Sequence, residues 1–244
     1  ILFFDHKKLL NLFSLKGEIY AIPFSFNFKN RNNTIQNKEI NFKAKSLNLN
    51  IFNQSNKEKN NYISGKNIVS TLDSKINTKY EIKNKIIVFE SSNSKIKNSK
   101  FSYNGELSTD PFDLDLNINS SNNEILKIFN INSILAEFIK SKLLFNDNIS
   151  INTSVIVNSN AKNEIFHNAK INFHIINGKI NFNKTKFIND SIGSLQLSNS
   201  DLSYKNNQLI FNADIQIDIK NSKNLFSFLN TKKSLRKDFK TILL

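Results

Sequence analysis

The sequence predicts a mainly-β protein: a long, curved antiparallel sheet of the groove or open-sandwich type, with a short central helix and a C-terminal helix. Apolar residues recur at every second position over long stretches of the chain. Phenylalanine, present 22 times, supplies much of this apolar content, whereas Gly (5) and Pro (2) are scarce. Because side chains alternate between the two faces of a strand, this pattern predicts strands with one apolar and one polar face.

The N-terminal region, residues 1–120, is expected to be antiparallel β structure. Residues 22–28 place Ile and three Phe at alternate positions. The alternation of residues 40–44 resumes one position out of phase at Leu47, which predicts a β-bulge near Lys45-Ser46. Asn104-Gly105 is a dipeptide typical of tight hairpin turns, and residues 112–118 resume the alternation as a strand.

A helical connector is expected at residues 121–145, because the apolar positions of 131–139 follow a helical spacing. The C-terminal region, residues 146–244, returns to period two. Residues 169–175 predict a strand that reverses at Asn177-Gly178, and residues 209–219 predict a second long strand. Asn221-Ser222 could then cap a final helix that ends in a basic stretch.

An internal repeat supports a duplicated β unit. Residues 17–28 and 105–116 both read Gly-Glu, four further residues, Pro-Phe and then alternating apolar positions. They contain the two prolines of the chain. Proline lacks the N–H of the strand ladder, so both prolines should lie at a strand start or edge.

The residues carry no pattern expected of an enzyme or a metal site. His6, His167 and His174 are widely separated, and the chain contains no Cys. Alternating aspartates such as Asp214 and Asp218 are typical of a solvated strand face. We therefore expect no catalytic residue, no metal and no cofactor.

The net charge of +14 points to an anionic partner or to a bias of composition. Lysine greatly outnumbers arginine. Proteins that recognise nucleic-acid sequences favour arginine, so a nucleic-acid partner is disfavoured. The basic C-terminal stretch is either a solvated helix face or a contact with anionic headgroups. Its candidate headgroup-contact residues are Lys232, Lys233, Arg236 and Lys237.

A strand with one apolar face must hide that face from water. A second protein layer can cover it, and so can lipid acyl chains, since each buried CH₂ contributes about 0.8 kcal/mol. The candidate lipid-facing residues lie on the predicted strands of both regions. They are Phe24, Phe26, Phe28, Phe112, Leu114, Leu116, Ile171, Phe173, Ile175, Phe211, Ile215, Ile217 and Ile219.

Several of these segments together resemble a known family. Gly105-Glu106 leads to Pro111-Phe112 and an alternating strand, followed by an amphipathic segment. Further on come a strand after Gly178, a hairpin from Gly193, the strand 209–219, the aromatic segment 224–229 and the basic stretch. This succession resembles the C-terminal region of the AsmA-like proteins of Gram-negative envelopes, which are related to bridge-like lipid-transfer proteins.

The resemblance implies a non-enzymatic periplasmic segment that binds phospholipid acyl chains and supports lipid transport or outer-membrane assembly. It implies an anchor in the inner membrane through a segment outside this chain, and the absence of Met suggests a piece of a longer protein. The partners would be phospholipid or a membrane surface, together with envelope proteins. The alternative is a structural or adhesive β-sheet protein of the envelope with no lipid cargo.

Overall fold

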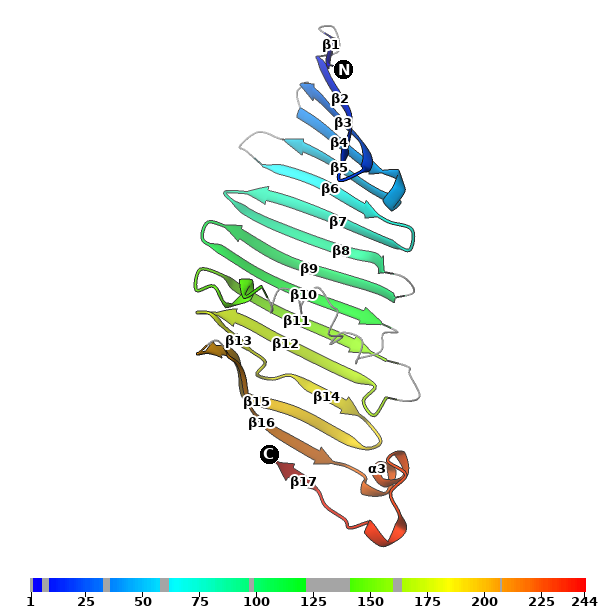
Figure 1. The fold of residues 1–244 in the computed structure, drawn as a ribbon, viewed down its shortest axis with the longest axis vertical. Helices are drawn as coiled ribbons and strands as arrows, with labels where there is room; N and C mark the ends of the chain where they lie inside the picture. Colours follow the sequence, from blue (N-terminus) through cyan, green and yellow to red (C-terminus); the bar gives the residue numbers. More distant parts are fainter. Residues whose placement is uncertain are drawn as a thin grey trace. The chain divides into compact units, whose positions relative to one another are not determined.

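The computed structural model describes residues 2–5, 9–32, 36–57, 62–96, 99–121, 141–159, 164–206 and 208–244 (Figure 1). These residues form seventeen strands, one α-helix and three 3-10 helices, which confirms the mainly-β class. The contacts divide the chain into unit 1, Ile1–Asp110, and unit 2, Pro111–Leu244. The central helix expected at 131–139 lies outside the described residues. Among the helices that are described, none is long and apolar enough to cross a membrane.

Unit 1 is an antiparallel meander in which each strand pairs with the next along the chain. Figure 1 shows these strands side by side in sequence order. The strands are β1 (Leu2–Asp5), β2 (Leu10–Ile19), β3 (Ile22–Asn32), β4 (Gln36–Ala44), β5 (Leu49–Lys57), β6 (Ile63–Ser70), β7 (Ser74–Lys83), β8 (Ile86–Ile96) and β9 (Ser99–Thr109).

Tight turns connect these strands without relying on glycine. Tyr20-Ala21 and Asn84-Lys85 have positive φ at both turn residues, the backbone that matches the twist of a hairpin. The bulge predicted at Lys45-Ser46 is wrong. A 3-10 turn, η1 (Lys45–Leu47), joins β4 to β5 there, and Asn48 completes it in the left-handed conformation. The phase change in the sequence therefore marks a change of strand rather than a defect within one.

The hairpin predicted at Asn104-Gly105 is also wrong, because both residues lie inside β9. Gly105 stands directly opposite Phe89 of β8, and the pairing continues on both sides of it. The chain instead turns at residues 110–111. A glycine inside a strand can leave room for a large cross-strand neighbour, and the dipeptide signal does not separate that role from a turn.

Unit 2 is antiparallel except for one pair. Its strands are β10 (Phe112–Ser121), β11 (Ser150–Asn158), β12 (Asn168–Ile176), β13 (Lys179–Asn181), β14 (Lys186–Asn189), β15 (Gly193–Lys205), β16 (Gln208–Ile219) and β17 (Thr241–Leu243). β10 and β11 run parallel. A parallel pair needs a long crossover, and residues 122–149 supply it.

The C-terminal predictions are confirmed at the level of the elements. Asn177-Gly178 forms the turn between β12 and β13 with positive φ at both residues. Residues 209–219 lie within β16. The final helix is α3 (Ser222–Phe228), and the side chain of Asn221 accepts a hydrogen bond from the backbone N–H of Asn224 as its N-cap. The basic stretch is not part of this helix as predicted, because α3 ends at Phe228 and the basic residues follow in and around a 3-10 turn, η4 (Lys233–Leu235).

A hydrophobic core lies in unit 2. Val157, Ala169 and Ile171 form one buried cluster. A second cluster contains Ile175, Ile180 and Leu144, which lies in a 3-10 turn, η3 (Leu143–Phe145), within the connection between β10 and β11. Protein side chains therefore cover at least part of the apolar face of this sheet.

Candidate functional site

The strand register of unit 1 places most of its apolar side chains on one face, while the other face carries Leu12, Phe52, Ile68 and Val88. Phe13 of β2 lies opposite Phe28 of β3, and Phe26 lies opposite Phe42 of β4. The same face continues through β5 to β9. We call it the apolar face of unit 1. It carries Phe13, Leu15, Phe24, Phe26, Phe28, Ile40, Phe42, Ile51, Val69, Ile76, Tyr80, Ile82, Ile87, Phe89, Tyr103 and Leu107.

Aromatic rings contact one another at both ends of this face. The ring centroids of Phe24 and Phe42 are 5.7 Å apart in a stacked arrangement. Phe13 and Phe26 meet edge to face at 6.1 Å. On the later strands, the centroids of Phe89 and Tyr103 are 6.2 Å apart. Such pairs add to the stabilisation that comes from burial of apolar area alone.

Each glycine within a strand of unit 1 stands opposite an aromatic residue. Gly17 pairs with Phe24, Gly65 with Tyr80 and Gly105 with Phe89. A Cβ atom on Gly65 would lie 2.5 Å from Cζ of Tyr80, so the ring occupies the space that a side chain would need. Gly17 and Gly65 leave the space that the rings of Phe24 and Tyr80 occupy. Sequence reasoning missed this role, although a glycine inside an unbroken alternation was a usable signal.

The apolar face of unit 1 remains partly open. Phe13 is 38% exposed and Leu15 46% exposed, while Phe24, Phe26 and Phe28 are half-buried. Among the described residues of unit 1, Ala44 is the one buried apolar side chain. The opposite face is mostly polar and carries pairs such as Lys29–Glu39, whose Nζ and Oε2 atoms are 3.3 Å apart. The two faces of this sheet therefore differ in chemistry.

The candidate lipid-facing residues of unit 2 fall into three environments. Ile171 and Ile175 are buried in the core, and Phe173 packs against it. Leu114, Leu116, Ile215, Ile217 and Ile219 are half-buried. Phe112 and Phe211 are exposed. Within unit 1 the structure brings Phe24, Phe26 and Phe28 together, whereas the unit 2 candidates are divided between a core and a surface.

The candidate headgroup-contact residues lie after α3. Lys232, Lys233, Arg236 and Lys237 are all exposed. Nε and Nη2 of Arg236 donate hydrogen bonds to the backbone carbonyl of Thr231, at 3.0 and 2.9 Å, which fixes the guanidinium near the chain. The lysines keep their ammonium groups available to solvent anions.

Polar side chains of β8 form hydrogen bonds at a register shift of the sheet. The hydroxyls of Ser91 and Ser94 are 2.7 Å apart at a register shift in β8, and both residues are buried. Ser94 also accepts a hydrogen bond from the backbone N–H of Asn77 at 3.0 Å. Within the described ranges, no three His, Cys, Asp or Glu side chains are grouped so that they could hold a metal ion.

No protein-family model, curated protein or solved structure matches this chain.

Proposed function

We propose that the chain is a non-enzymatic β-sheet protein that binds the acyl chains of phospholipids on the apolar face of unit 1. The observation that carries the proposal is the continuity of this face over eight strands, β2 to β9, with its aromatic side chains half-buried or exposed. Contiguous apolar surface of this kind marks an interaction site. Acyl chains match it because they need apolar contact and no hydrogen-bond partner.

One cross-strand row of the face stays apolar from β2 to β7, whereas the row beside it changes to Asn53, Asn67 and Thr78 on β5 to β7. The apolar row consists of Leu15, Phe26, Phe42, Ile51, Val69 and Ile76. Along this row, neighbouring strands repeat aromatic and branched aliphatic side chains about 4.8 Å apart. An acyl chain that moves from one strand to the next exchanges one set of apolar contacts for an equivalent set. Such movement needs no catalytic residue. This is the physical basis for proposing a role in lipid transport rather than only in storage.

The cellular setting of the proposal rests on the resemblance to the AsmA-like family. We place the protein in the periplasm, anchored to the inner membrane through a segment outside this chain. Its role there would be lipid transport or support of outer-membrane assembly. Spheroplast fractionation would test the location, since recovery of the native protein in the cytosolic fraction would contradict it.

The second candidate function is a structural or adhesive sheet with no lipid cargo. The buried clusters of unit 2 favour it for that part of the chain, because a sheet whose apolar face is covered by protein needs no other cover. The two functions differ in what contacts the apolar face of unit 1.

Native mass spectrometry of the protein purified from membranes distinguishes acyl-chain binding from a structural role without lipid. We expect co-purified phospholipid. Phe26→Asp should reduce the bound lipid strongly, because it places a charge among Leu15, Phe24, Phe28 and Phe42 on the apolar face. Asn27→Asp is the matched control, since it adds the same charge one residue away on the polar face.

Lipid-free protein that is folded and monomeric would contradict the acyl-chain proposal and favour the structural alternative. Equal loss of lipid in the Phe26→Asp and Asn27→Asp variants would contradict the assignment of the two faces. Circular dichroism of both variants separates loss of lipid from loss of fold.

A further inference from the structure

One edge of unit 1 presents apolar residues at the tips of its turns. The meander brings the turns at residues 20–21, 45–48 and 71–73 to the same ends of the strands (Figure 1). Tyr20 is 96% exposed, Leu72 77% and Leu47 52%. The turn Asn84-Lys85 lies at the opposite edge, where Nζ of Lys85 forms an ion pair with Asp110 at 2.6 Å. The opposite edge carries one such apolar turn residue among the described residues, Leu9 at 45% exposed, so the three tips of the first edge form the larger apolar group.

A row of lysines crosses the polar face just behind these tips. The register aligns one residue from each strand, β2 to β9, in a single cross-strand row. Five members of the row are lysines and the other three are Ser or Asn. In order they are Lys16, Ser25, Lys43, Asn50, Ser70, Lys75, Lys95 and Lys100. Strands lie about 4.8 Å apart, so the row is about 35 Å long.

The row has an unbalanced charge. Lys75 stands directly opposite Lys95, and Lys95 directly opposite Lys100. Like charges in directly opposed pairs destabilise a sheet. The ion pairs of the described residues do not include Lys75 or Lys95, and both are exposed. An external anion would remove this repulsion.

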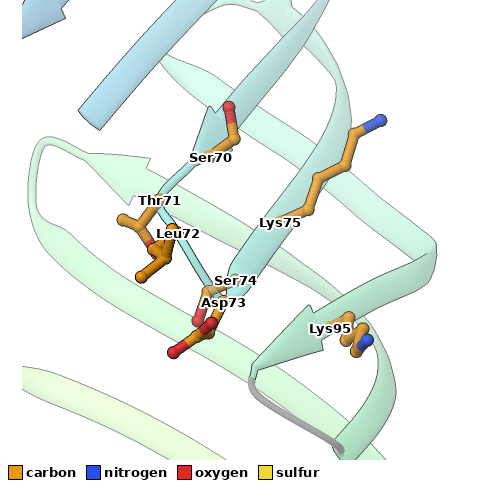
Figure 2. Close-up of a pocket in the computed structure, with 7 residues that line it drawn as sticks. All are labelled: Ser70, Thr71, Leu72, Asp73, Ser74, Lys75 and Lys95. Atoms are coloured by element: carbon orange, nitrogen blue, oxygen red, sulfur yellow. The ribbon is translucent and has the colours of Figure 1, made fainter. Parts of the chain in front are cut away.

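A shallow depression lies between the apolar turn 71–73 and the lysine row. Ser70, the turn 71–73, Ser74, Lys75 and Lys95 line it. Figure 2 shows Leu72 at the turn, with Lys75 and Lys95 on the two strands beside it. Asp73 is the acidic group of this turn, and Glu18 lies two residues from Lys16 on β2. These two carboxylates do not balance the positive charges of Lys45 and the five lysines of the row, so this edge carries a net positive charge.

We propose that this edge of unit 1 docks on the surface of an anionic lipid bilayer. Tyr20, Leu47 and Leu72 enter the interfacial layer, where aromatic and aliphatic side chains gain most from leaving water. The lysines behind them contact the headgroup phosphates. A nucleic acid would use the charges but not the apolar tips, so a bilayer accounts for both features. The docking edge is separate from the proposed acyl-chain site and does not depend on it.

Vesicle sedimentation of the full chain tests the proposal. We expect binding to vesicles of phosphatidylcholine with phosphatidylglycerol, weak binding to phosphatidylcholine alone, and weaker binding as salt rises. K75Q/K95Q should lower the partition coefficient about 25-fold, since each lysine near an anionic surface contributes about fivefold. K66Q/K83Q is the matched control, because both lysines are exposed on the same polar face but lie further from the apolar tips, and it should change binding only slightly.

Leu72→Ser tests insertion of the tips and should weaken binding about tenfold. Ile86→Ser, at the opposite edge, is its control. The proposal is overturned if K75Q/K95Q binds as K66Q/K83Q does, if Leu72→Ser binds as wild type, or if the wild-type chain does not bind the anionic vesicles. Co-purified phospholipid in the same variants reports on the acyl-chain proposal separately, and we expect it to be unchanged.

Discussion

Units 1 and 2 use the same alternating strands but cover them differently. In unit 2, Ile175 and Ile180 are almost fully buried, and Leu144 from outside the strands packs against them. In unit 1 the corresponding apolar face has aromatic residues that are half-buried or exposed, and Ala44 is its buried apolar side chain in the described ranges. The comparison teaches that an alternating pattern specifies which face is apolar. It does not specify what covers that face.

The largest expected effect is in the core of unit 2. Ile175→Ala should lower the free energy of unfolding by about 2–5 kcal/mol, because it leaves a cavity among fully packed neighbours. Ile40→Ala is the matched change on the apolar face of unit 1 and should cost clearly less, because Ile40 is half-exposed and loses fewer contacts. Urea denaturation of both variants measures the difference. An equal cost would mean that protein covers the apolar face of unit 1 as completely as it covers that of unit 2.

An intermediate effect is expected at the glycines beneath the rings of unit 1. A Cβ atom on Gly65 would lie 2.5 Å from Tyr80 and 2.7 Å from the backbone carbonyl of Gln54, which cannot move freely. Gly65→Ala should therefore destabilise the protein by about 1–3 kcal/mol. Gly17→Ala should cost less, because its Cβ atom would meet only the ring of Phe24, at 2.9 Å. Thermal denaturation of the two variants checks the order, and the reverse order would contradict the ring positions.

The smallest effect is expected on the polar face of unit 1. Lys29→Gln removes the ion pair with Glu39, in which both side chains are 33% exposed. Solvent screens such a pair, so the loss should stay below about 1 kcal/mol. Denaturation midpoints with and without added salt measure it. A loss larger than that of Ile40→Ala would show that the polar face, rather than the apolar face, stabilises unit 1.

The strands and their faces could be predicted from the sequence, because alternation is a local signal. Residues 22–28, 112–118, 169–175 and 209–219 all lie in strands. The glycine-bearing turn at Asn177-Gly178 was predicted for the same reason. The turn at Tyr20-Ala21 could not be, since neither residue is typical of positive φ.

Features that depend on neighbouring strands were missed or predicted wrongly. Gly105 looked like a turn residue because its partner Phe89 is distant in the sequence. The parallel pairing of β10 and β11 depends on a crossover whose path the sequence does not reveal. The lysine row, to which Lys75 and Lys95 belong, could not be recognised before the register was known, because its members are spread over 85 residues of sequence. A candidate site of this kind belongs to the sheet rather than to any one segment.

The nearest-neighbour pairing of unit 1 has a consequence for how such a protein can lengthen. Each strand contacts only the strand before it and the strand after it, as in repeat proteins whose stability is a sum of local terms. An inserted or deleted hairpin adds or removes two strands, so every remaining side chain keeps its face. A single added strand would reverse the direction of the chain that follows. Hairpins are therefore the units in which a sheet of this type can grow or shrink while its apolar face stays continuous.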